Sequence, residues 1–329
     1  MLPSSLPPTN MKRQLALLLI ATLAAASLHA QDVPKKRPER PVTSKIPEAQ
    51  RKLGTMPIPP GTRVLRDLAY VPDGHERQKL DLYLPEKGGN LPLIVWIHGG
   101  GWQNGSKDRT QAVKFVPQGY AVASINYRLS SHAIFPAQIE DCKAAIRWLR
   151  AHAKEHGIDP QRIGVWGSSA GGHLVAMLGV TGDVKEFDKG LNLDQSSRVQ
   201  CVVDFFGPTE LFTMQAQTVI QGPINHDAPE SPESKLIGAT VKEAKAKADK
   251  ASPLTYVSKG GAPILIMHGD KDPLVPLKQS EVFLEALKKA GVDATLHVVP
   301  GAGHGFGGPE IDEKVGAFFA SHLKRAPSQ

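Results

Sequence analysis

Two adjacent serines lie between glycines in the stretch VWGSSAGGHLVAM, which covers residues 165–177. A serine hydroxyl attacks a carbonyl carbon only when a base takes its proton, and a histidine is the usual base. The strand-like run RIGVWGSS ends with the pair and the helix-forming run AGGHLVAMLGV follows it, so the serines are expected on a strand-to-helix turn. This pattern predicts nucleophilic catalysis by one of the two.

The spacing of small residues distinguishes the two serines. A turn this tight needs nearly side-chain-free residues two positions before and two positions after its centre. With Ser169 at the centre these positions are Gly167 and Gly171. With Ser168 at the centre the first of them would hold a tryptophan, whose indole would clash. We therefore predict that Ser169 is the nucleophile and that Ser168 fills the turn.

Candidates for the acid and the base follow later in the chain, in the order that this kind of turn requires. The segment PILIMHGDKDPLVP ends a strand with Asp270 and Asp272, and TLHVVPGAGHGF ends the last strand with His304 on a glycine-rich loop. Either carboxylate could hold the imidazole in the tautomer that accepts the serine proton. Asp270 is expected to cap N–H groups of its own loop. Asp272 precedes Pro273, whose ring favours an extended conformation that directs the carboxylate toward His304.

A further motif supplies donors for a developing oxyanion. In LIVWIHGGGWQNG the residues Gly99 and Gly100 follow an apolar strand, and their bare N–H groups can approach a tetrahedral intermediate. The N–H of Ala170, which follows the nucleophile, is predicted to be another donor. Trp102 and Phe306 flank the expected site, and the sequence allows either a pocket-lining or a core position for them.

Alternating strand-like and helix-like segments must position these motifs. The central strand-like runs are continuously apolar, as in strands buried on both faces, and helical patterns occupy residues 135–157, 170–180 and 276–292. The strand-like runs are RVLRDLAYV, QKLDLYLP, LPLIVWIHG, YAVASINYRL, RIGVWGSS, VQCVVDFFG, PILIMHGD and ATLHVVPG. This order predicts a mostly parallel eight-stranded sheet with helices on both faces. Its first two strands are expected to be antiparallel, because only a short turn separates them.

One segment interrupts the alternation. Residues 208–252 contain no strand pattern, and an insertion after a strand's carboxyl end lies over the ligand crevice in such sheets. We interpret it as a small cap within a catalytic domain of residues 61–326, with its Lys/Glu/Ala-rich part forming a solvated helix.

The N-terminal segment has the features of a secretion signal. Lys12 and Arg13 precede a short apolar run, which predicts a signal peptide over residues 1–30. The run is shorter than the roughly 20 residues of a membrane span, so no stable span is expected after cleavage. A proline-rich basic linker over residues 31–60 follows. We therefore expect an exported protein, periplasmic or secreted.

Charge and cysteine content exclude several functions. Residues 1–52 carry nine Lys/Arg and three Asp/Glu and so account for six of the seven net positive charges, which leaves a nearly neutral domain without the basic surface that nucleic acid requires. Cys142 and Cys201 lie in different predicted elements and are expected to be buried free thiols. Neither cysteine has partners at metal-ligand spacing, so no metal and no cofactor are expected.

Together these motifs resemble those of α/β-hydrolases of the esterase/lipase group, and more narrowly the family named for bifunctional feruloyl and acetyl xylan esterases. The resemblance rests on LDLYLP, PLIVWIHGGGWQNGSKD, INYRLS, GSSAGGHLVAM, ASPLTYVS and HGDKDPLVP, which are spread over residues 80–306. It implies the α/β-hydrolase fold, the catalytic residues Ser169, Asp272 and His304, and oxyanion donors at Gly99 and Gly100.

The function expected from these observations is that of an exported serine ester hydrolase. It would form an acyl-enzyme on Ser169 and remove small acyl groups, acetyl or feruloyl, from a polysaccharide or a small-molecule ester. The same residues also suit a prolyl-oligopeptidase-like peptidase, a formamidase or a lactonase. A non-catalytic binding module would lack a member of the triad, and none is missing. The oligomeric state is left open.

Overall fold

The computed structural model describes residues 57–324 of the chain. The expected signal peptide, residues 1–30, and residues 31–56 of the expected linker lie outside the described residues. Within the described part, no helix is both long and apolar enough to cross a membrane.

Eight strands form one sheet in the order β1-β2-β4-β3-β5-β6-β7-β8. β1 and β2 pair antiparallel, as do β2 and β4, and every other pair is parallel. The strands are β1 (Thr62–Ala69), β2 (Lys79–Pro85), β3 (Leu91–Ile97), β4 (Ala121–Ile125), β5 (Ile158–Ser168), β6 (Cys201–Phe205), β7 (Ile264–Gly269) and β8 (Ala294–Val299). The predicted mostly parallel eight-stranded sheet with an antiparallel start is therefore confirmed.

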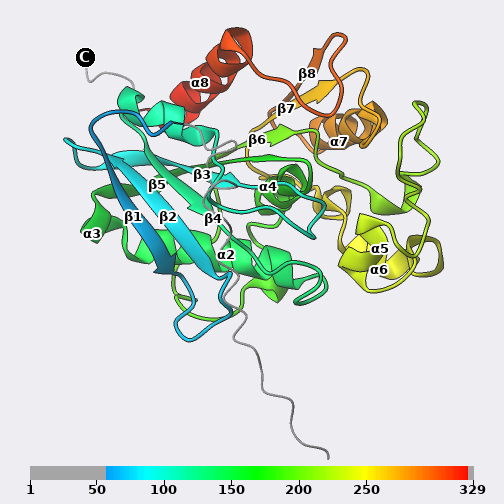
Figure 1. Ribbon diagram of the computed structural model, residues 1–329, viewed down its shortest axis with the longest axis horizontal. Coiled ribbons are helices and arrows are strands. Elements are labelled where there is room, and N and C mark those ends of the chain that lie inside the picture. The colour runs from blue at the N-terminus through cyan, green and yellow to red at the C-terminus, as the bar shows by residue number, and fades with distance from the viewer. Residues whose placement is uncertain (1–56, 325–329) are drawn as a thin grey trace, which may run out of the picture. The chain divides into compact units, whose positions relative to one another are not determined.

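Helices cover both faces of this sheet because its central strands are apolar on both sides. Successive side chains of a strand point to opposite faces, so Val95 and Ile97 of β3 join one core cluster while Ile94 and Trp96 join another. The first cluster lies beneath α2 (Ala137–Ala151), α4 (Ala170–Val180) and α7 (Leu277–Lys289). The second is covered by the 3₁₀ helix η1 (Ala112–Gln118) and by α8 (Pro309–Leu323), which Figure 1 shows on the side opposite α2.

One predicted helix is divided. The pattern over residues 135–157 predicts a single helix, whereas the structure has α2 and then a separate turn of helix, α3 (Ala153–His156). His152 separates them with φ −98° and ψ 12°, outside the helical region, while its ring Nδ1 bonds to the carbonyl of Trp148 at 2.9 Å. The helix therefore ends one turn before the pattern suggests.

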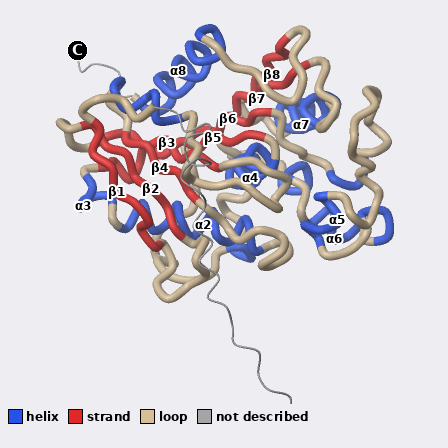
Figure 2. The backbone as a smooth tube through the Cα atoms, in the orientation of Figure 1, coloured by secondary structure: helices blue, strands red, loops and turns tan. Residues whose placement is uncertain are grey.

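Residues 208–252 contain no strand and consist mostly of loops, with two short helices, α5 (Pro232–Ile237) and α6 (Lys245–Lys250) (Figure 2). Three single-turn 3₁₀ helices, η3 (Leu211–Thr213), η4 (Val241–Glu243) and η5 (Pro253–Tyr256), lie within or just after the segment, and η2 (Lys185–Phe187) precedes β6. The segment is anchored to the main core. Leu236, Val241 and Ala248 are fully buried in the cluster that lies beneath α4. In the Lys/Glu/Ala-rich part, α6 forms with Ala248 as its one buried residue and with most of its other side chains exposed, as predicted for a solvated helix.

The segment also contacts loops at the carboxyl ends of two different strands. A Cβ placed on Gly101, in the loop after β3, would lie 3.3 Å from the Cβ of Pro232. A Cβ placed on Gly222 would lie 1.7 Å from the carbonyl oxygen of Pro273, in the loop after β7. Residues 208–252 therefore reach from one side of the strand ends to the other, where the predicted site residues lie.

The two cysteines are free and buried, as predicted. Cys142 on α2 belongs to the cluster on one face of the sheet, and Cys201 on β6 belongs to the cluster on the other. The sheet itself separates the thiols, which makes a disulfide between them impossible in this fold.

Candidate functional site

Ser169 occupies the turn between β5 and α4 in a conformation that few residues adopt. Its φ is 55° and its ψ is −122°, while its N–H donates to the carbonyl of Phe205 at 2.8 Å. A Cβ at Gly167 would lie 2.3 Å from the carbonyl oxygen of Gly171, and a Cβ at Gly171 would lie 2.1 Å from that of Ile97. Side chains at either position would collide with main chain, as the spacing predicts. Ser168 is the last residue of β5 and pairs with Phe205 in the ladder, so Ser169 is at the centre of the turn.

Asp272 and His304 are brought together from the loops after β7 and β8. His304 Nδ1 lies 2.7 Å from Asp272 Oδ2, and because a carboxylate only accepts, this nitrogen carries the proton. The Asp272 side chain is fully buried. Burial by itself would raise the pKa of this carboxyl, but hydrogen bonds from His268 and His304 outweigh it and hold the pKa well below its usual range. Asp272 is therefore ionised wherever the imidazole can act as a base.

The other aspartate of this loop, Asp270, has a hydrogen-bond partner that differs from the expected one. Asp270 was predicted to cap its own loop, but its Oδ1 accepts the N–H of Gly301, on the loop after β8, at 2.7 Å. The capping oxygen of the loop belongs to Asp272, whose Oδ1 accepts the N–H groups of Leu274 and Val275 at 2.8 and 2.9 Å. An aspartate commonly bonds main-chain groups two and three residues on, and here the same carboxylate does so while also bonding the histidine.

Ser169 and His304 both lie around the end of β6. Ser169 bonds to the carbonyl of Phe205, and the ring of Phe206 lies 4.5 Å from that of His304 between centroids. No hydrogen bond joins Ser169 Oγ to His304 in the described part of the chain, and His304 Nε2 has no partner there. Such contacts often tighten only when substrate binds. The free lone pair of Nε2 is what a general base requires.

The loop after β3 passes beside the serine. A Cβ placed on Gly99 would lie 3.4 Å from Ser169 Cβ and 2.7 Å from the carbonyl of Ser168. Gly100 has φ 112°, a conformation that side chains disfavour, and its carbonyl accepts the N–H groups of the two residues that close the loop, Gln103 and Asn104. Ala170 is the first residue of α4, so its N–H has no acceptor within the helix. Gly99 and the first turn of α4 thus lie beside the serine.

His98, Arg77 and Tyr127, whose role the sequence did not indicate, hold the glycine loop after β3 in place. His98 Nδ1 donates to the carbonyl of Gly99 at 2.7 Å, and its Nε2 accepts from the Arg77 guanidinium at 3.1 Å, because an arginine can only donate. The imidazole stacks on Tyr127 with 4.4 Å between ring centroids. Burial lowers the pKa of His98 to about 4, so the ring is neutral when it makes these bonds.

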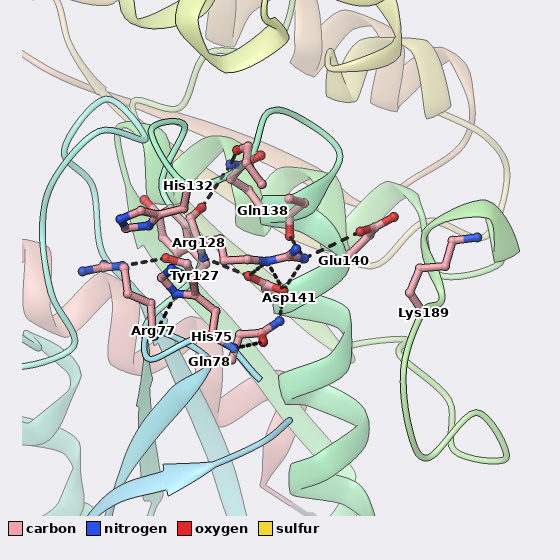
Figure 3. Close-up of polar contacts among 12 residues, drawn as sticks. His75, Arg77, Gln78, Tyr127, Arg128, His132, Gln138, Glu140, Asp141 and Lys189 are labelled. Carbon is pink, nitrogen blue, oxygen red and sulfur yellow. Dashed lines mark hydrogen bonds and ion pairs between the residues drawn. The ribbon is translucent and has the colours of Figure 1, made fainter. Parts of the chain in front are cut away.

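Arg77 connects this histidine to the rest of the domain. Its Nε donates to the carbonyl of Tyr127 at 2.8 Å, and its Nη2 donates to that of Gly105 at 3.0 Å. Figure 3 shows Arg77 next to Tyr127, with Gln78 reaching Asp141 of α2. Nothing in the sequence near Arg77 indicates this role, because its partners are 21 to 50 positions away along the chain.

The two possible pocket residues have different positions. Trp102 is 1% exposed, and its indole Nε1 donates to His173 Nδ1 at 3.2 Å, so it belongs to the core and not to a pocket wall. Phe306 is half-buried and packs on Phe205 and Phe206, with ring centroids 4.9 and 5.3 Å apart. Because Phe206 also contacts His304, Phe306 remains a candidate for lining the site.

A cavity of about 460 Å³ lies next to the loop of Asp272. It is bounded by residues 216–220, by the loop residues Asp270, Asp272 and Pro273, and by the start of α7 with Glu281. Neither Ser169 nor His304 lines it. Elsewhere in residues 57–324, no group of three or more His, Cys, Asp or Glu side chains could hold a metal ion.

Comparisons with known proteins are consistent with this geometry. A family model described as BD-FAE matches residues 80–287. The esterase LipQ of Mycobacterium tuberculosis is 29% identical over 278 residues, which cover 80% of this chain and 64% of LipQ. The chain thus spans less than two thirds of the length of that relative.

Solved structures are similar over most of the described domain. One is a truncated form of a carbohydrate esterase from gut microbiota, which matches with a TM-score of 0.74 and 34% identity over 80% of this chain and 97% of that one. Another is the propionate-bound esterase Est2 of Thermogutta terrifontis, a Planctomycetes species, with a TM-score of 0.62 and 28% identity over 82% of this chain and 97% of that one.

Proposed function

The chain belongs to the BD-FAE family and has the α/β-hydrolase fold, and on that premise we propose that it is a serine carboxylic ester hydrolase. Ser169 acts as the nucleophile, His304 as the general base and Asp272 as the acid that orients the base. The observation that carries this proposal is the 2.7 Å bond between His304 Nδ1 and Asp272 Oδ2, on loops beside a strained serine turn.

The proposed reaction gives each of these groups one role. Ser169 Oγ attacks the ester carbonyl carbon while its proton passes to His304 Nε2, and the new imidazolium faces ionised Asp272. The carbonyl oxygen becomes an oxyanion that the N–H groups of Gly99, Gly100 and Ala170 stabilise. The intermediate then expels the alcohol, which takes the proton from Nε2, and leaves an acyl-enzyme. Water attacks in the same way and releases the carboxylic acid.

A small acyl group carried by a polysaccharide, acetyl or feruloyl, is the proposed substrate. Two similar proteins support it, since one is described as a carbohydrate esterase and the other holds propionate. The signal-like sequence at residues 1–30 also supports an exported enzyme, periplasmic or secreted, which would meet such polymers outside the cytoplasm.

A hydrolysis panel tests the proposal. It compares p-nitrophenyl acetate, butyrate and octanoate, methyl ferulate, acetylated xylan and a prolyl anilide. We expect turnover of the short esters and of acetylated xylan, with none of the anilide. Activity confined to the anilide would identify a peptidase. No turnover and no labelling by a serine-directed phosphonate would contradict serine hydrolase function. EDTA is expected to leave the rates unchanged.

A further inference from the structure

A second histidine contacts the carboxylate of Asp272. His268 lies on β7, four residues before Asp272, and its side chain is fully buried. Its Nε2 lies 3.3 Å from Asp272 Oδ2, the same oxygen that accepts the proton of His304. The carboxylate oxygen that orients the proposed base is thus shared between two imidazoles.

The partners of His268 determine where its proton is. Nε2 also lies 2.9 Å from the carbonyl of Val275, which can only accept, so Nε2 carries the hydrogen and shares it between this carbonyl and Asp272 Oδ2. Nδ1 lies 2.7 Å from Ser280 Oγ on α7, so the second ring nitrogen also has a hydrogen-bond partner. Both nitrogens of His268 are therefore occupied, and the ring cannot turn without losing bonds.

These contacts hold the loop of Asp272 in one conformation. Val275 accepts from His268 through its carbonyl and donates through its N–H to Asp272 Oδ1 at 2.9 Å. Among residues 57–324, Asp272 Oδ1 receives two main-chain N–H groups, whereas Oδ2 receives only the two histidines. Without His268, Oδ2 would have His304 as its remaining partner among the described residues, and the two N–H bonds to Oδ1 alone would oppose rotation of the carboxylate.

We propose that His268 is a positioning residue of the ester hydrolysis, and that its Nε2–H holds Asp272 Oδ2 where His304 Nδ1–H must donate. This inference depends on the proposed function, because it assigns His268 to the same triad. His268 does not touch the reacting atoms, and its effect is transmitted through Asp272. Loss of the donor lets the carboxylate and the His304 ring rotate away from Ser169. A misplacement of about 1 Å at such a site can cost on the order of 10² in rate.

Two amide substitutions of His268 distinguish the loss of its Nε2–H donor from the loss of the imidazole ring. In His268→Gln the side-chain amide nitrogen can occupy the place of Nε2 and still donate, whereas the shorter His268→Asn places its nitrogen near Nδ1 and cannot reach Asp272. For p-nitrophenyl acetate we expect His268→Asn to lower kcat by about 10- to 100-fold with KM changed less than about twofold. We expect His268→Gln to retain kcat within about threefold.

A spectroscopic measurement covers the case in which both variants are slow. The proton between His304 Nδ1 and Asp272 Oδ2 should give a strongly deshielded ¹H NMR resonance at low pH in the wild-type protein. We expect His268→Gln to keep this resonance and His268→Asn to lose or shift it. Phe319→Leu on α8, a buried residue of the core cluster that does not include α7, is the control for general destabilisation and should keep both kcat and the resonance.

The outcomes separate this inference from the proposed function. Wild-type protein that neither turns over the esters nor reacts with a phosphonate contradicts the function itself. An active wild type whose His268→Asn variant keeps kcat overturns the role of His268. So does a His268→Asn variant whose deshielded resonance is unchanged.

Discussion

Asp270 and Gly301 join the loops after β7 and β8 by a hydrogen bond of 2.7 Å, in which the N–H of Gly301 donates to Asp270 Oδ1. The bond connects the loop of Asp272 to the loop of His304 without using either side chain. Asp270→Ala should therefore lower the free energy of unfolding by about 1 kcal/mol, the typical contribution of one such bond, and leave kcat nearly unchanged. Denaturant unfolding and p-nitrophenyl acetate hydrolysis measure the two effects.

Asp272→Asn should have the opposite profile. The amide can still accept the main-chain N–H groups of Leu274 and Val275, but it no longer offers a carboxylate to His304, and the imidazole then loses its tautomer-setting partner. We expect kcat to fall by around 10⁴. If Asp270→Ala is inactive while Asp272→Asn still hydrolyses the ester, the acid of the triad is assigned to the wrong residue.

Ser169 should be the residue that reacts. Ser169→Ala is expected to reduce ester hydrolysis by at least about 10³-fold, while Ser168→Ala retains most of it. A serine-directed phosphonate should modify a single peptide, the one that contains Ser169, as peptide mass spectrometry can establish. Modification of Ser168 would contradict the assignment of Ser169 as the nucleophile from the glycine spacing.

The strained turn predicts a difference between two inactive variants. Ser169 has φ 55°, a conformation that costs on the order of 1–3 kcal/mol for most residues and little for glycine. Ser169→Gly should therefore be more stable than Ser169→Ala by about 1 kcal/mol, and neither should hydrolyse esters. Thermal unfolding of the two proteins measures the difference. Equal stability would mean that the turn relaxes when the serine is removed.

Stability should rise with pH between about 4 and 6.5. Burial lowers the pKa of His98 and that of His173 to about 4, so the unfolded chain binds protons at both positions that the folded state does not. Burial raises the pKa of Asp204 to about 6, which acts in the opposite direction. Burial also lowers the pKa of His132 and His156 and raises that of Glu140, so the histidines outnumber the carboxyl groups and the unfolded chain binds at least about one extra proton, or on the order of 1 kcal/mol per pH unit. Unfolding in urea at pH 4.5, 5.5 and 6.5 tests the slope.

Asp204→Asn isolates the opposing group. The side chain is fully buried on β6, with Oδ1 accepting the N–H of Gly207 and Oδ2 unpaired among the described residues. Ionising such a group above pH 6 destabilises the fold. The amide should therefore raise the free energy of unfolding by on the order of 1–3 kcal/mol at pH 8, and by less at pH 5. A variant that is equally destabilised at both pH values would show that the carboxylate has a stabilising partner.

Several features of the domain followed from local sequence alone. Continuous apolar runs determined the strands, because a strand buried on both faces needs apolar residues at every position. The glycines two positions before and after Ser169 identified the centre of the turn, because the main chain leaves no room there for a Cβ. The motifs spread over residues 80–306 indicated the family, which the match over residues 80–287 confirms.

Only the tertiary structure decided which distant groups meet. It placed Trp102 in the core, one of the two positions that the sequence allowed, and gave Asp270 a partner on another loop. It also revealed that Arg77 and His98 hold the glycine loop and that His268 shares the carboxylate of Asp272 with His304. The packing of the sheet and its loops sets these contacts between residues up to 71 positions apart in the chain, and no local sequence pattern indicates them. The sequence by itself determined the elements and the types of residue at their ends, and the packing of the sheet determined which side chains bond.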